Sequence, residues 1–188
     1  GGGRIQEGVG NYAAIFAENI EASGVVPQIS AIMGNCAGGG VYSPALTDFI
    51  LMVDKTSQMF ITGPLVIKEV TGEDVKMQDL GGAKIHSQIS GVSDLVARDD
   101  FDCLEKIKRV LSFLPSNYTQ KPPAVDSWVD PDPGREGIIQ VLPDSPKKVY
   151  DMRKLISLIV DGGEFFEIKP GFARNIVTGF GRLKGRVV

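Results

Sequence analysis

A run of glycines after a short apolar segment is the feature that most constrains how this chain can fold. The run lies in ISAIMGNCAGGGVYSPALTD, residues 29–48. Alternating apolar residues at its start predict a short buried strand, and the glycines predict a turn into a helix. Three consecutive glycines favour close approach of a ligand to bare backbone, and amides at a helix N-terminus favour negative charge. Gly38–Gly40, the glycine turn, is therefore a predicted oxyanion-binding site. A tight turn that needs only small residues is the alternative, because short glycine motifs are weak signals.

The segments around the glycine turn alternate between helical and strand-like patterns. Apolar residues spaced by three and four predict a helix over 5–20 that stops at Gly24. Continuous apolar runs at 25–33, 49–53 and 58–62 predict parallel strands that are buried on both faces. This βαβ rhythm predicts an α/β fold.

Further helices are expected after these strands. Two short ones are predicted over 63–72 and 73–82, and a longer amphipathic helix over 99–114. The apolar face of the longer helix is expected to comprise Phe101, Leu104, Ile107, Leu111 and Leu114.

A proline-rich stretch divides the chain. Residues 115–146 hold seven of the eleven prolines and almost no hydrophobic period. A helix over 150–160, a strand over 164–169 and a hairpin with its turn at Lys184 and Gly185 are expected after it. We predict three parts, a first domain over 1–114, a linker over 115–149 and a second domain over 150–188. Because the chain opens on Gly1 without Met and stops at Val188 within an apparent strand, we expect a fragment.

Composition excludes several classes of partner. A net charge of −3, without clustered basic residues, gives no electrostatic reason to expect nucleic acid or a membrane surface. Cys36 and Cys103 lie far apart without nearby Cys or His, so neither a metal site nor a disulfide framework is expected. We expect a reducing compartment, the cytoplasm or, in a eukaryote, the mitochondrial matrix. No apolar run approaches the length of a membrane span.

The whole chain resembles the carboxyltransferase β chains of biotin-dependent acyl-CoA carboxylases, the propionyl-CoA and acetyl-CoA carboxylase group. That resemblance implies the crotonase-like (ClpP/crotonase) fold in two tandem domains, each incomplete here. The blocks that carry it are GGRIQEG (2–8), SGVVPQISAIMGNCAGGGVYSPALTDF (23–49), MFITGP (59–64), LGGAKIHSQISG (80–91) and YDMRKLISLIVDGGEFFEIKPGFARNIVTGFGRLKGR (150–186).

The resemblance also implies the chemistry. Such enzymes transfer a carboxyl group from carboxybiotin to the α-carbon of a short-chain acyl-CoA, propionyl-CoA or acetyl-CoA, through an enolate. It implies that amides at the catalytic residues Gly38 and Gly39 stabilise the enolate oxygen, and that no metal is needed. The residues implied to contact substrate are Ala37, Gly40, Gly1, Gly2, Gly3 and Arg4, of which Arg4 could instead pair with Glu7.

The implied partners are acyl-CoA, a biotin carboxyl carrier protein, a biotin carboxylase and further copies of the complete chain in a hexamer. Two alternatives stay open. The first is the α chain of a biotin-dependent methylmalonyl-CoA decarboxylase, which runs the same chemistry backward. The second is a non-catalytic acyl-CoA-binding fragment.

Single residues argue against other reactions of the same fold. Tyr42 stands where hydratases of the crotonase superfamily keep a carboxylate, so we expect a packed tyrosine and no water addition. Related proteases would need a nucleophilic serine in place of Gly38 or Gly39, and Ser43 comes a helical turn too late. His86, the single histidine, is expected to have a structural hydrogen-bonding role in its turn.

Overall fold

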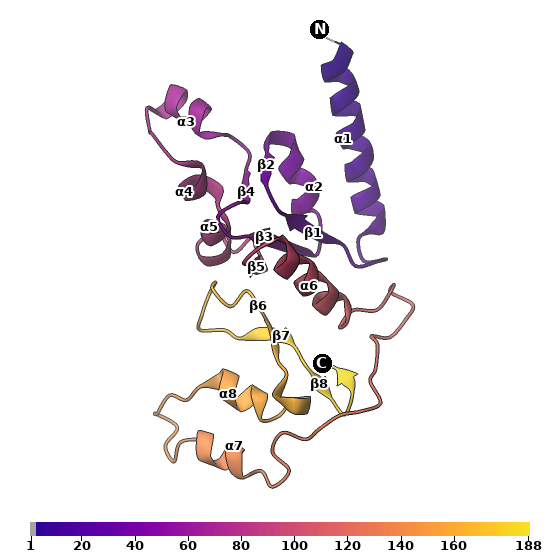
Figure 1. The fold of residues 1–188 in the computed structure, drawn as a ribbon, viewed down its shortest axis with the longest axis vertical. Coiled ribbons are helices and arrows are strands. Elements are labelled where there is room, and N and C mark those ends of the chain that lie inside the picture. Colours follow the sequence, from indigo (N-terminus) through magenta and orange to yellow (C-terminus); the bar gives the residue numbers. More distant parts are fainter. Residues whose placement is uncertain (1–2) are drawn as a thin grey trace.

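A computed structural model describes residues 3–188, with side chains described from residue 12 onward. Figure 1 shows helix α1 beside a layer of short strands, with the C-terminal elements gathered below that layer. The elements before the linker are α1 (Gly3–Ala22), β1 (Ile29–Ile32), β2 (Asn35–Ala37), η1 (Gly38–Val41), α2 (Tyr42–Ala45), β3 (Phe49–Val53), β4 (Gln58–Phe60), α3 (Pro64–Thr71), α4 (Met77–Gly81), α5 (Ala83–Gln88), β5 (Leu95–Ala97) and α6 (Asp100–Leu111). The elements after residue 115, where the predicted linker begins, are α7 (Glu136–Val141), α8 (Met152–Ser157), η2 (Asp161–Gly163), β6 (Phe166–Ile168), β7 (Thr178–Phe180), β8 (Arg182–Leu183) and β9 (Arg186–Val187).

The centre of the structure is a parallel sheet in the order β1–β3–β5. Its middle strand is the continuous apolar run that predicted a strand buried on both faces, and Leu51, Met52 and Val53 are at most 1% exposed. A second parallel pair joins β2 to β4. The predicted α/β class is therefore confirmed. Helix α1 also ends as expected, since Gly24 follows it with a positive φ of 73°.

Strands β2 and β5 were not expected from the sequence. Each has three residues, too few for a period of two to stand out. Helix α7 was also missed, because it lies within the proline-rich stretch that predicts a linker.

Helix α6 forms as predicted but turns a different face to the core. Cys103 and Val110 are buried, as is Phe113 just after the helix, whereas Phe101 is 83% exposed. The predicted apolar stripe is wrong at Phe101, Leu104 and Leu111, because a second set of apolar residues with helical spacing packs on β3 and β5.

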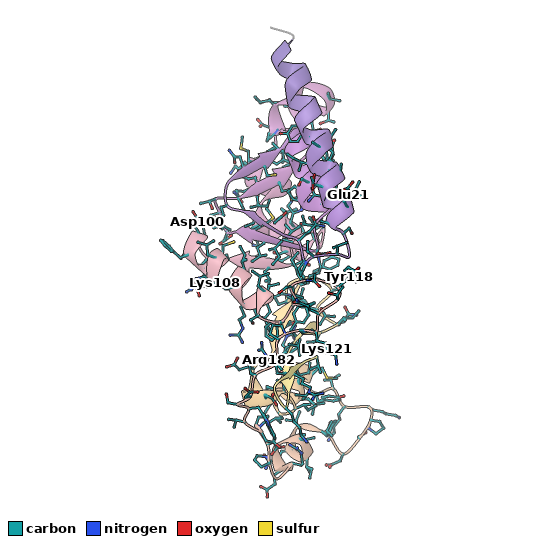
Figure 2. All side chains as sticks on the ribbon, turned by 90° about the vertical axis from the view of Figure 1, so that its right-hand side faces the viewer. Glu21, Asp100, Lys108, Tyr118, Lys121 and Arg182 are labelled. Atoms are coloured by element: carbon teal, nitrogen blue, oxygen red, sulfur yellow. The ribbon has the colours of Figure 1, made fainter. Side chains whose placement is uncertain are left out.

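The C-terminal strands pack against the end of α6. The Phe113 ring stacks with both Phe166 and Phe180, whose centroids are 5.8 and 5.5 Å away. The Arg182 guanidinium, labelled below α6 in Figure 2, lies 4.5 Å from the Phe113 centroid and donates to Ser112 O at 2.7 Å. The parts before and after the linker thus share one contact surface.

The expected C-terminal hairpin is confirmed. Strands β8 and β9 pair in antiparallel fashion around Lys184 and Gly185, whose φ angles are 50° and 76°. Two positive φ angles are typical of the tight turn that suits the twist of paired strands. No helix among residues 3–188 is long and apolar enough to cross a lipid bilayer.

The hydrogen bonds of the Asp102 carboxylate in α6 lead to a first prediction, about stability at acid pH. Lys106 Nζ donates to Asp102 at 2.5 Å and the Arg98 N–H at 2.9 Å, and these bonds lower the pKa of Asp102 from 3.8 to about 2. A pKa lowered in the folded state stabilises the fold above about pH 4, and this stabilisation is lost as pH falls toward about 2. Thermal midpoints measured across this interval should fall less steeply for Asp102→Asn than for wild type.

Asp74→Asn is the matched control, because Asp74 makes an exposed ion pair with Lys68 and exposed pairs contribute little. The Asp74 variant should retain the wild-type pH slope. An Asp102→Asn slope equal to wild type would contradict the assignment.

Candidate functional site

The glycine turn forms where β2 ends and η1 begins. Gly38 has a φ of +62°, a conformation that side chains disfavour, and a Cβ at Gly38 would meet no atom within 4 Å. At the other end of η1, the Tyr42 N–H donates to Gly39 O and closes the last turn. The first N–H groups of such a turn have no partner inside it. The backbone at Gly38 and Gly39 thus combines amides free of intrahelical bonds with space for an incoming group.

The core holds the turn from below. Val41, the last residue of η1, is 5% exposed and packs in a cluster with Met52, Met59 and other buried residues. The Cys36 thiol donates to Gly40 O with a sulfur–oxygen distance of 3.3 Å. Both contacts fix the backbone on either side of Gly38 and Gly39.

Helix α1 covers one side of the turn with an aromatic ring. A Cβ at Gly39 would lie 3.7 Å from Tyr12 Cε2, which is an ordinary contact distance. Tyr12 stacks on Phe16, and the edge of Phe16 meets Tyr42, with centroids 6.0 Å apart in each pair. Tyr12 and Phe16 belong to the helix predicted over 5–20, but no pattern in the sequence associates them with the glycines.

A polar cluster locks α1 to α2. The Ser43 hydroxyl donates to Asn19 Oδ1 at 2.7 Å, and Asn19 Nδ2 donates to Gln28 Oε1 at 2.8 Å. Ser43 is thus engaged in a structural bond, which agrees with excluding it as a nucleophile.

The predicted site residues are brought together only in part. Ala37, Gly38, Gly39 and Gly40 are contiguous at the end of β2. Gly3 is the first residue of α1, at the end of that helix that points away from the sheet in Figure 1. The substrate contacts predicted for Gly1, Gly2 and the Arg4 side chain lie outside the described residues.

His86 has the structural role that the sequence analysis expected. Its Nε2 lies 2.6 Å from Met59 O and its Nδ1 lies 2.8 Å from Ser90 Oγ. Ser90 follows His86 by four residues, a spacing at which helical side chains meet, but the serine was not recognised from sequence. Tyr42 packs less fully than expected, because its side chain contacts Phe16 but remains 46% exposed.

Neither cysteine is suited to nucleophilic chemistry. Cys103 is fully buried, Cys36 partly so, and burial raises the pKa of both thiols. Reactive cysteines need the opposite shift, because the thiolate is the nucleophile. Among the described residues, no group of three or more His, Cys, Asp or Glu side chains is placed to hold a metal ion.

Two hollows in the surface lie away from the glycine turn. One of about 280 Å³ is bordered by Trp128, Asp161 and Arg182, and one of about 350 Å³ by Asp94, Phe166 and Lys169. The turn itself lies beside the exposed Tyr12 and Tyr42 rather than in either hollow. A large ligand bound at the glycine turn would need additional protein surfaces around it.

Comparison with known proteins assigns the chain to a family. The carboxyl transferase domain model matches residues 1–188. The chain is 53% identical to the methylmalonyl-CoA decarboxylase subunit alpha of Veillonella parvula and 52% identical to the propionyl-CoA carboxylase carboxyltransferase subunit of Haloferax mediterranei, over its full length in both cases. It spans 38% and 37% of these two relatives, a little over a third of their length.

A solved structure agrees with this result. The crystal structure of transcarboxylase 12S with hydrolysed methylmalonyl-coenzyme A bound superposes with a TM-score of 0.91 at 50% identity. The match covers all of this chain and 38% of that one. The expected crotonase-like carboxyltransferase fold, partly represented here, is confirmed.

The buried thiols lead to a second prediction. Cys36→Ala and Cys103→Ala, introduced singly into the full-length protein, should each retain turnover within a few-fold of wild type. Loss of the Cys36 thiol removes one weak hydrogen bond, and loss of the Cys103 thiol leaves a small cavity. Turnover per folded molecule is the quantity to measure. Complete inactivation of either variant with an unchanged melting temperature would require a mechanism that uses a thiolate.

Proposed function

The chain belongs to the carboxyl transferase domain family, and from that membership we propose that it forms the acyl-CoA half of a carboxyltransferase site. The proposed reaction moves a carboxyl group from carboxybiotin to the α-carbon of propionyl-CoA or acetyl-CoA. The observation that supports the proposal is the glycine turn, where amides without intrahelical partners, a positive φ and open space coincide at Gly38.

The glycine turn suits the charge that develops in this reaction. Removal of the α-proton from a thioester places negative charge on its carbonyl oxygen. Preorganised backbone N–H groups stabilise such an oxygen, and loss of one donor typically costs about 10²–10³ in rate. In the proposed arrangement, the amides of Gly38 and Gly39 donate to that oxygen, while Ala37 and Gly40 border the acyl group.

Among the described side chains, Tyr42, the two cysteines and His86 are poorly suited to take the α-proton. Tyr42 stands where a hydratase would carry a carboxylate, both thiols are held protonated, and the His86 ring nitrogens are engaged by Met59 and Ser90. Carboxybiotin would supply the carboxyl group and, once that group has left, the basic ureido group that accepts the proton. The chain's own task is then to orient the thioester and stabilise its enolate.

The rest of the site would come from elsewhere in the assembly. We propose the division into 1–114, 115–149 and 150–188, with the biotin-side oxyanion hole in the remainder of the second domain. The partners would be a biotin carboxyl carrier protein, a biotin carboxylase and further copies of the complete chain. Transcarboxylase 12S assembles as a hexamer, which supports the same state here. The two relatives compared above are bacterial and archaeal, and we propose a cytoplasmic location.

Decarboxylation of methylmalonyl-CoA is the second candidate. The 53% identity to a decarboxylase alpha subunit equals, within one per cent, the identity to a carboxylase subunit. Both reactions pass through the same enolate, so the glycine turn serves either.

A third prediction concerns Gly39. Gly39→Val in the full-length protein should lower kcat by at least about 10², because the side chain occupies the space where the thioester oxygen must approach. The fold should persist, since Gly39 has no positive φ and its Cβ would make an ordinary contact with Tyr12. Gly34→Val is the matched control, because Gly34 also lacks a positive φ and a Cβ there would meet nothing within 4 Å. Wild-type turnover in a folded Gly39→Val protein would contradict the proposed oxyanion hole.

A fourth prediction concerns direction and substrate. The full-length protein should carboxylate propionyl-CoA or acetyl-CoA when supplied with carboxylated biotin. Residues 1–188 alone should be inactive, because the effective molarity of two reactants is lost when only one is oriented. Decarboxylation of methylmalonyl-CoA without net carboxylation of either thioester would favour the second candidate. Activity in neither direction would contradict the proposed function.

A further inference from the structure

A buried backbone carbonyl on strand β4 connects His86 to the glycine turn. Gln58 N–H donates to Gly34 O at 3.1 Å, so the peptide groups of Gln58 face the strand that leads into the turn. Alternate residues of a strand direct their peptide groups to opposite sides, and Met59 O therefore faces the outer edge of the β2–β4 pair. Met59 is 5% exposed, so this carbonyl needs a partner from within the protein.

The segment after β4 is shaped to supply that partner. Gln58 forms an antiparallel bridge with Gly82, which brings the junction of α4 and α5 alongside the outer edge of β4, as Figure 1 shows. A Cβ at Gly81 would lie only 2.2 Å from Met59 O, so only glycine allows this approach. His86 Nε2 then lies 2.6 Å from the same oxygen.

The bond from His86 has a fixed direction. Met59 O can only accept, so His86 Nε2 carries the proton that is donated. In the neutral ring, Nδ1 is then an acceptor for the Ser90 hydroxyl at 2.8 Å, and in the charged ring it donates to the same oxygen. Ser90 thus orients the ring in both states, and the donor to Met59 persists.

Two routes lead from Met59 to the glycines. Met59 lies opposite Cys36 in the parallel β2–β4 register, and the Cys36 thiol donates to Gly40 O. The Met59 side chain also belongs to the buried cluster that holds Val41, the residue after the glycines. A shift of β4 at Met59 would therefore move both flanks of the turn.

We infer that His86 is a positioning residue for the oxyanion hole. Its Nε2–H fixes β4 at Met59, and β4 in turn holds the Gly38 and Gly39 amides where the thioester oxygen is stabilised. This inference rests on the proposed function for its catalytic consequence, whereas its structural content, order at the glycine amides, is independent of it.

The test uses full-length variants and two readouts. His86→Leu removes the donor, whereas His86→Gln can restore an N–H near the position of Nε2. His86→Leu should lower kcat at least tenfold with KM for the acyl-CoA within about threefold, because oxyanion donors act on the transition state. His86→Gln should recover most of the loss. Ser90→Ala, which frees the ring, should give a smaller decrease in kcat.

Lys84→Ala is the matched control, an exposed position on the same helix. Hydrogen exchange at the Gly38–Val41 amides is the second readout, and it should accelerate in His86→Leu but not in Lys84→Ala. If His86→Leu does not fold, Ser90→Ala is compared with His86→Gln instead. Ser90→Ala should then show the lower kcat and the faster exchange of the two, with smaller differences from wild type.

The two readouts separate the outcomes. If wild type transfers no carboxyl group but His86→Leu accelerates exchange at the glycine amides, the proposed function fails and the positioning role stands. If wild type is active and His86→Leu changes neither kcat per folded molecule nor exchange, the positioning role is overturned. A lower melting temperature with unchanged kcat and exchange would likewise reduce His86 to a purely structural residue.

Discussion

The burial of strand β3 on both faces is the constraint on which the rest of the structure depends. Its residues alternate between two separate clusters, because side chains of a strand point to opposite sides of the sheet. Ile50 and Met52 pack with Val41 and Met59 beneath the glycine turn. Leu51 and Val53 pack with α6 and with β6 from the C-terminal part. One short strand thus joins the layer that carries the site to the layer that receives the C-terminal segment.

This arrangement explains how a turn with open space beside it can keep a well-defined backbone conformation. The glycines themselves contribute little packing, and their conformation is set by neighbours that are buried. Val41 fixes one flank through the core, Cys36 binds Gly40 O, and Tyr12 of α1 covers the side of Gly39. Preorganised donors cost no reorganisation when charge develops, so a rigid base beneath the Gly38 and Gly39 amides suits enolate stabilisation. The same logic explains why a histidine without a place in the chemistry can matter to it.

The fold class and the location of the turn could be predicted because they depend on local signals. The FILMV run is typical of a strand buried on both faces, and a triple glycine after a strand marks a turn. The buried face of α6 could not be predicted, because two apolar stripes share that helix and only the packed sheet selects the one with Cys103 and Val110. The pairing of β5 with β3 and the position of Tyr12 beside Gly39 depend on contacts between segments that are distant in the sequence. Such contacts produce no hydrophobic periodicity from which they could be predicted.

A structure of the full-length protein with a non-hydrolysable acyl-CoA analogue tests the central claim most directly. The account predicts that the acyl carbonyl oxygen, or the atom that replaces it, lies about 2.7–3.1 Å from the backbone nitrogen of Gly38 or Gly39. It also predicts that the acyl chain lies beside Ala37 and Gly40. An analogue bound with this oxygen directed away from the glycine turn, in a protein that transfers carboxyl groups, would contradict the account.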